Sequence, residues 1–247
     1  MTRRSLLVAA GVAAFLVFVI ARVPAHQLAS RLPGGIAMQG VGGTIWSGRA
    51  SQLAVNGAPI GALEWSCRPW RLLALKWSCR VNLRPAGGAL VAELSGGLDG
   101  ELLATGLSGQ VPLAAFEGMA TPPGWSGSLE LDVERLRIVA RRPIEAAGKL
   151  FVRSLKAPGP GGPLLGDFEL TVGEGAVGTD TLTGRLRDLG GPLRVRGAIE
   201  LRPDGSYLLS GEVAPGPGAG PAIFDTLAFL GPPDELGRRP FAIEGTL

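Results

Sequence analysis

The chain has 247 residues, of which 46% are hydrophobic, 39 are glycine and 20 are proline, and its formal net charge is +3. This hydrophobic content excludes a chain that is disordered throughout, because it is sufficient for a buried core. One histidine and two cysteines leave too few ligands for a histidine- or cysteine-based metal site. No dense basic stretch with interleaved aromatic residues is present, so we expect neither a metal nor a nucleic-acid partner.

The first predicted element is an uncharged, mostly apolar run at residues 5–21, preceded by two arginines. Its length is close to what an α-helix needs to cross a bilayer, and the arginines favour a cytoplasmic N-terminus. We expect residues 1–25 to form a cytoplasmic tip and an uncleaved single-pass anchor in the inner membrane, with the bulk of the chain in the periplasm. A cleavable signal peptide is the alternative, because residues 23–25 loosely resemble a cleavage site, although Arg22 argues against it.

The tetrapeptide Trp-Ser-Cys-Arg occurs twice, at residues 65–68 and 77–80, and contains both cysteines. Apolar and polar residues alternate around each copy, which predicts two strands that each have one apolar face. If the strands pair antiparallel about a turn near Leu73, the opposed pairs are Cys67 and Cys79, Trp65 and Val81, and Leu63 and Leu83. Directly opposed cysteines can form a disulfide, so the repeat predicts a hairpin, a Cys67–Cys79 disulfide and an oxidising compartment.

Other uses of the two cysteines are less favoured. A metal site lacks further ligands, because the only histidine, His26, lies far away beside the apolar run. A redox-active pair usually has the spacing Cys-x-x-Cys, which is absent. Two unbridged thiols in an apolar core remain the alternative to the disulfide.

Residues 26–247 consist of short alternating segments punctuated by glycine. Glycine tolerates tight turns, bulges and strong curvature, so we expect a mainly β fold, in which a curved antiparallel sheet forms one periplasmic domain. The proline- and glycine-rich stretches at residues 158–163 and 215–221 are predicted loops and possible internal breaks.

Four elements of this body are clear from the sequence. An alternating stretch at residues 128–139 predicts a strand. Residues 191–202 and 206–213 flank a Pro-Asp-Gly turn and predict a hairpin. Residues 222–230 predict one short helix, and residues 241–247 a final strand.

No catalytic constellation is found, and we expect neither enzymatic activity nor a cofactor. Residues 173–178 match G-x-G-x-x-G, but strand-like sequence follows where a dinucleotide site needs a helix, so a glycine-rich hairpin is favoured. A serine nucleophile would have only His26 as its base. The carboxylates Asp132 and Glu134, and likewise Asp167 and Glu169, are spaced by two along predicted strands, as on any polar strand face.

Five basic residues gather near the predicted cysteine hairpin: Arg68, Arg71, Lys76, Arg80 and Arg84. They could face anionic lipid headgroups, because they follow the anchor closely in sequence. A solvated polar strand face opposite the tryptophans and cysteines is the favoured interpretation.

One segment carries a family resemblance. Residues 40–50 read Gly-Val-Gly-Gly-Thr-Ile-Trp-Ser-Gly-Arg-Ala, and a Gly-x-Leu-x-Trp strand follows at residues 61–65, with Pro69 after it. With the glycine-punctuated body and the C-terminal Leu-Ala-Phe-Leu-Gly at residues 227–231, this pattern resembles protein N of the type II secretion system, also called general secretion pathway protein N (GspN). The motif residues are Gly43, Thr44, Trp46, Ser47, Gly48 and Trp65.

The motif by itself predicts packing. Gly43 and Gly48 are expected to bracket a strand in which Trp46 buries its ring. The resemblance implies a non-enzymatic inner-membrane accessory subunit that contacts other inner-membrane platform subunits in the periplasm and supports export of folded proteins across the outer membrane. A membrane-anchored lipid-binding or lipid-transfer β-domain is the alternative, and it requires a continuous apolar groove.

Overall fold

The computed structural model describes residues 11, 18, 22–29, 32, 35–97, 100–116, 123–139, 142–159, 161–173 and 181–246. The predicted anchor at residues 5–21 lies outside the described residues, apart from Gly11 and Phe18. Among the residues that are described, no helix combines the length and the apolar character that crossing a membrane requires.

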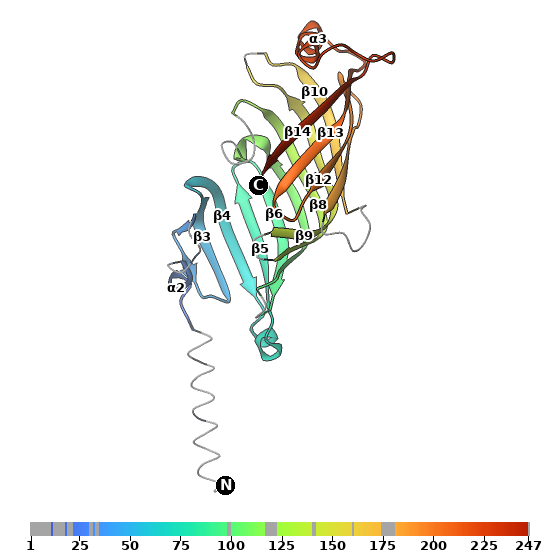
Figure 1. Cartoon of the computed structure of the whole chain (residues 1–247). Coiled ribbons are helices and arrows are strands. Elements are labelled where there is room, and N and C mark those ends of the chain that lie inside the picture. The colour runs from blue at the N-terminus through green and yellow to red at the C-terminus, as the bar shows by residue number, and fades with distance from the viewer. Residues whose placement is uncertain are drawn as a thin grey trace.

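The described body is one antiparallel sheet whose strands follow one another in chain order (Figure 1). The short helix α2 (His26–Ala29) precedes it. The first strands are β1 (Ile36–Gln39), β2 (Gly42–Gly43), β3 (Ser47–Val55), β4 (Ala58–Cys67), β5 (Trp77–Pro85), β6 (Ala89–Gly96) and β7 (Leu102–Pro112). Strand β2 pairs with β3 outside the main order. Two 3₁₀ helices, η1 (Pro69–Ala74) and η2 (Leu113–Phe116), follow β4 and β7.

The second half continues the same sheet. Its elements are β8 (Ser126–Val139), β9 (Arg142–Lys156), β10 (Leu164–Val172), β11 (Leu182–Asp188), β12 (Leu193–Leu201), β13 (Ser206–Pro215), the helix α3 (Pro221–Ala228) and β14 (Arg239–Thr246). Register shifts interrupt the pairs β3–β4, β6–β7, β8–β9 and β9–β10. Such bulges increase local twist, and the sheet is strongly curved (Figure 1).

The mainly β, antiparallel fold predicted from the sequence is confirmed. Strands β12 and β13 form the predicted hairpin, with Val195 opposite Val213. Strand β8, helix α3 and strand β14 correspond to the predicted strand at 128–139, the helix at 222–230 and the final strand at 241–247, whose last residue is outside the described part. Most of the G-x-G-x-x-G segment also lies outside it, between the paired strands β10 and β11.

A single row of paired residues crosses twelve strands, from β3 to β14, on one face of the sheet. In chain order it consists of Ala50, Leu63, Leu83, Leu90, Gly109, Leu131, Leu150, Leu170, Leu186, Gly197, Gly211 and Phe241. Every member is apolar or glycine, and the leucines are half-buried. We call the face that carries this row the apolar face. Because partner residues across a sheet share a face, apolar alternation in each strand produces one continuous stripe.

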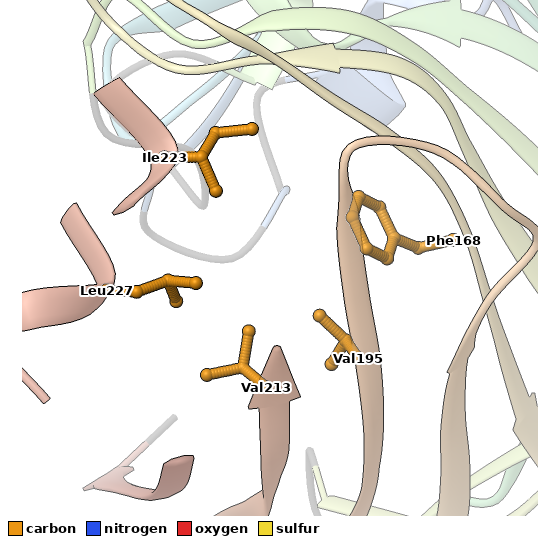
Figure 2. Close-up of a cluster of buried hydrophobic side chains, with 5 residues drawn as sticks. All are labelled: Phe168, Val195, Val213, Ile223 and Leu227. Atoms are coloured by element: carbon orange, nitrogen blue, oxygen red, sulfur yellow. The ribbon is translucent and has the colours of Figure 1, made fainter. Parts of the chain in front are cut away.

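Helix α3 covers the apolar face at one end. Ile223 and Leu227 are buried and point toward Phe168, Val195 and Val213 of strands β10, β12 and β13 (Figure 2). We call this the α3 end of the sheet. The opposite end carries η1, between β4 and β5 (Figure 1). We call it the η1 end.

Candidate functional site

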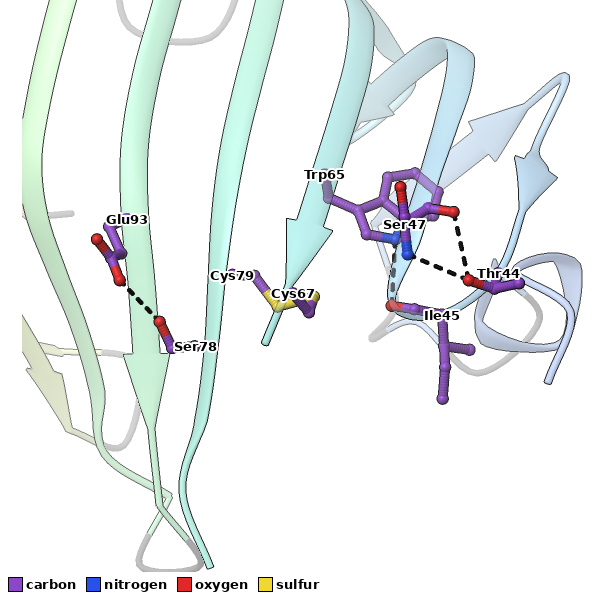
Figure 3. Close-up of a disulfide and its surroundings, with 8 residues drawn as sticks. All are labelled: Thr44, Ile45, Ser47, Trp65, Cys67, Ser78, Cys79 and Glu93. Carbon is purple, nitrogen blue, oxygen red and sulfur yellow. Dashed lines mark hydrogen bonds between the residues drawn. A yellow bond between two sulfur atoms is a disulfide. The ribbon is translucent and has the colours of Figure 1, made fainter. Parts of the chain in front are cut away.

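The cysteine hairpin forms as the sequence predicted. Strands β4 and β5 pair antiparallel with Cys67 opposite Cys79, and the two residues form a disulfide (Figure 3). The two other predicted pairs, which join Trp65 with Val81 and Leu63 with Leu83, are also confirmed. The disulfide therefore closes the base of the loop that contains η1.

The family motif forms a tight turn between β2 and β3. The Thr44 N–H donates to the Ser47 carbonyl at 2.9 Å, and the Ser47 N–H donates to the Thr44 hydroxyl at 3.2 Å. Gly43 has a φ of +91°, in the left-handed region that favours glycine, and an added Cβ would lie 2.5 Å from the Ser47 carbonyl oxygen. The strand expected around half-buried Trp46 is thus wrong, because Thr44 to Trp46 form the turn and β3 begins at Ser47.

The tryptophan ring that packs against the motif is that of Trp65, which lies in the neighbouring strand β4. A Cβ on Gly48 would lie only 2.4 Å from Cζ2 of this ring, so the ring occupies the space that a side chain at position 48 would need. The Trp65 indole N–H also donates to the Ile45 carbonyl at 3.2 Å (Figure 3). The motif glycine and the tryptophan of the first Trp-Ser-Cys-Arg copy are therefore one packing unit.

The segment after the predicted anchor is attached to this same turn. The Ala25 N–H donates to the Gly43 carbonyl, and the Ile45 N–H donates to the Val23 carbonyl, both at 3.1 Å. The Cys67 N–H in turn donates to the Trp46 carbonyl at 2.6 Å. Three segments that are distant in the sequence therefore meet at the η1 end, namely residues 22–25, the motif turn and the disulfide hairpin.

Two carboxylates on the polar face of the sheet have lowered pKa values. The buried Ser78 hydroxyl donates to Glu93 at 2.9 Å, and Arg68 lies 3.2 Å from the same oxygen. The hydrogen bond from Ser78, with a smaller contribution from Arg68, holds the pKa of Glu93 below its usual value. This pairing fixes Arg68, the residue after β4, to strand β6.

Glu169 is only 4% exposed and has three partners. Arg187 donates to it at 2.8 Å, the Thr171 hydroxyl donates at 3.0 Å, and Lys149 lies 3.6 Å away. The hydrogen bond from Arg187 is the main reason that the pKa of Glu169 lies below its ordinary value. A carboxylate held ionised in this way cross-links strands, and it is poorly suited to accept a proton near neutral pH.

The other carboxylates singled out in the sequence do not join it in a site. Asp167 accepts from the Ser154 N–H at 2.7 Å and lies 3.5 Å from Arg153, while Asp132 is opposite Lys149 in the register. Within the described ranges, no group of three or more histidine, cysteine or acidic residues could hold a metal ion.

The predicted basic group divides into two kinds. Arg68 pairs with Glu93, and Arg84 pairs with Glu64 at 3.3 Å, as expected for a polar strand face. Arg80 is also on this polar face, opposite Glu93 in the register, whereas Arg71 and Lys76 are exposed on the loop between β4 and β5. Sequence reasoning did not separate the two kinds, because the loop conformation decides which charges meet a carboxylate.

Sequence reasoning did not predict that four large apolar residues at the α3 end are exposed. They are Phe224, Phe229, Leu230 and Leu236, with Phe229 91% and Leu236 73% exposed. We call these four residues the α3 cap. The sequence did contain a signal for this exposure, namely a mostly apolar run in a short predicted helix. Such a helix can bury only one face against the sheet, so apolar residues on its other faces stay exposed. Large exposed apolar side chains are candidates for protein or membrane contacts.

Comparison with known proteins gives a consistent match. A family described as "Type II secretion system (T2SS), protein N" matches residues 34–242. The chain is 27% identical to the type II secretion system protein N of Aeromonas hydrophila over the full length of both chains. It is 26% identical to the protein of the same name from Vibrio cholerae serotype O1 over 93% of each chain. No solved structure gives a significant match.

Proposed function

The chain belongs to the type II secretion system protein N family, and we propose that it is a non-enzymatic accessory subunit of that machinery in the inner membrane. In this proposal residues 1–25 form the cytoplasmic tip and anchor, and residues 26–247 form one periplasmic domain. The family match is the observation that carries the proposal. Partners are expected among the other inner-membrane subunits of the system, and the protein would support export of folded proteins through protein–protein contacts.

The arrangement of the sheet supports this orientation. The anchor would leave the membrane at residues 22–25, which are hydrogen-bonded to the motif turn at the η1 end. The α3 cap lies at the other end of the sheet (Figure 1). A chain anchored at the η1 end would therefore present the α3 cap to the periplasm, away from the bilayer.

We propose the α3 cap as the surface that binds a partner subunit. Aromatic side chains at the centre of an interface often dominate its energy, and truncating one commonly costs about 2 kcal/mol or more. Phe229 and Leu236 are the most exposed large apolar residues of the described chain. Their burial against a partner would remove apolar area from water without disturbing the core beneath α3.

The double substitution Phe229→Ser and Leu236→Ser should weaken co-purification with inner-membrane secretion subunits. If the pair contributes about 2 kcal/mol, binding falls about 30-fold. The matched control is Val91→Ser on β6, which removes an exposed apolar side chain away from the cap. Both variants should keep the wild-type thermal unfolding midpoint. Undiminished co-purification of the double variant would show that the partner contacts another surface.

A lipid-binding β-domain is the second candidate, and the continuous apolar row favours it. The row crosses twelve strands, and among the described helices only α3 and η2 pack near it, at one end of the sheet. Acyl chains could lie along such a stripe, because apolar surface gains free energy when it leaves water.

Photocrosslinking tests the lipid hypothesis directly. A photoreactive benzoylphenylalanine in place of Leu131, in the row, should capture membrane lipid if the hypothesis is right. The matched control replaces Glu130, the neighbouring residue whose side chain lies on the opposite face and is exposed. Equal lipid capture at the two positions, or none at either, would count against a lipid-carrying face.

A further inference from the structure

The loop between β4 and β5 holds large apolar side chains in solvent. We call residues 68–76 the η1 loop. Trp70 is 63% exposed, Leu75 is 65% exposed and Leu72 is also exposed. The Leu75 and Lys76 N–H groups donate to the Leu72 and Arg71 carbonyls at 2.9 and 3.2 Å. Backbone hydrogen bonds therefore fix the loop in a conformation that displays its apolar residues.

One residue of the loop is held in an unfavourable backbone conformation. Leu75 has a φ of 55°, in the left-handed region that residues with a β-carbon rarely occupy. This conformation ends η1 as its C-cap, and it leaves most of the Leu75 side chain in water. The exposed leucine is therefore available for contact with a surface outside this chain.

The charged residues of the η1 loop itself, Arg68, Arg71 and Lys76, are all basic. Arg71 and Lys76 are exposed beside Trp70 and Leu75, and the sequence contains no acidic residue between Glu64 and Glu93. The same two basic residues line a hollow of about 320 Å³, whose carboxylate, Glu101, is paired with Arg137. Tryptophan with leucine, flanked by arginine and lysine, is the composition that favours the interface of a bilayer with anionic lipids.

The location of the loop identifies which surface it would meet. Val23, at the exit of the apolar run, accepts a hydrogen bond from Ile45, and Trp46 accepts one from Cys67 at the start of the loop. The Cys67–Cys79 disulfide closes the base of the loop, and Cys67 is hydrogen-bonded to the motif turn. If residues 5–21 cross the membrane, the bilayer surface lies next to the η1 end.

We propose that the η1 loop inserts into the periplasmic headgroup layer of the membrane that holds the anchor. Trp70 and Leu75 enter the upper acyl region, and Arg71 and Lys76 contact anionic lipid phosphates. The inference rests on the anchoring part of the proposed function. Its consequence is a second attachment, which fixes the tilt of the sheet and directs the α3 cap away from the bilayer.

The test uses the full chain reconstituted in lipid nanodiscs that contain phosphatidylglycerol with brominated acyl chains. Bromine quenches only tryptophans that reach the bilayer. Trp70→Phe should abolish most of the quenching seen in the wild type. The matched control is Trp125→Phe, which precedes β8 at the α3 end and should leave the quenching unchanged. Circular dichroism should show the same β content in all three proteins.

A second variant tests the role of charge. Arg71→Gln with Lys76→Gln should reduce the quenching of Trp70 in phosphatidylglycerol discs to the level seen in phosphatidylcholine discs. Wild-type quenching in this variant would overturn the electrostatic contact. If the chain stays in the discs but Trp70→Phe leaves the quenching unchanged, loop insertion is wrong and anchoring stands. If the chain does not enter the discs at all, both the inference and the proposed anchor fail.

Discussion

Replacing Cys67 and Cys79 together by alanine should lower the free energy of unfolding by about 3 kcal/mol. The disulfide joins residues separated by 12 positions and directly opposed in β4 and β5, so it restricts the unfolded chain while the native strands remain in register. Because the η1 loop contains an exposed leucine with a positive φ, the loop is also expected to open more readily once its base is free. Urea unfolding followed by tryptophan fluorescence measures both the midpoint and the slope.

Reduction of the wild-type disulfide is the control for this prediction. Dithiothreitol should lower the urea midpoint of the wild type to that of the double variant, and it should not change the variant. A wild-type midpoint that is indifferent to reductant, in a protein whose disulfide is verified by mass spectrometry, would contradict the expected stabilisation. Hydrogen exchange of residues 68–76 should increase in the variant more than exchange in β12 and β13.

Gly48→Ala is expected to destabilise the protein by about 1–3 kcal/mol, the usual cost of an added group in a filled space. A Cβ at this position would lie 2.4 Å from Cζ2 of the Trp65 ring and 2.8 Å from the Gly42 carbonyl oxygen. Neither neighbour can move easily, because the ring is tied to Ile45 by its indole N–H and the carbonyl belongs to the paired strand β2. Thermal unfolding of the variant measures the loss.

The same hairpin supplies a matched control for Gly48. Gly42 has no atom within 4 Å of the place where a Cβ would lie, so Gly42→Ala should change the unfolding free energy by less than about 0.5 kcal/mol. Adding Trp65→Leu to Gly48→Ala should cost less than the sum of the two single substitutions, because the smaller side chain relieves the clash. Strict additivity would mean that the ring and the glycine do not share the space inferred for them.

The Cys67–Cys79 pairing could be derived from the sequence because it depends on local alternation. Two short strands with apolar residues at every second position, joined by residues 68–76, allow few registers, and the doubled tetrapeptide selects one of them. The hairpin of β12 and β13 follows from the same kind of signal, with Pro-Asp-Gly at the turn. Both elements are confirmed by the observed pairing.

The family motif shows where local reasoning is insufficient. Glycine, threonine and tryptophan at residues 43–48 are compatible with a strand, and a buried Trp46 is the simplest interpretation of the sequence alone. In the structure the motif is a turn (Figure 3). The ring that fills the space beside Gly48 comes from Trp65, seventeen positions later. Which tryptophan packs on which glycine is set by the pairing of β3 with β4, where Gly48 is opposite Trp65.

The sequence by itself determined the mainly β class, the hairpins of β4 with β5 and β12 with β13, and the disulfide register, because these depend on periodicity and turn residues. Only the tertiary structure decided which apolar residues are exposed to solvent and which charged residues form ion pairs. Trp70, Leu75 and Phe229 are apolar and would be assigned to a core by composition, yet the fold places them at opposite ends of the sheet in solvent. The physical reason is that burial depends on what packs across the sheet, and a one-layer sheet covered by α3 at one end cannot bury every apolar side chain that its sequence carries.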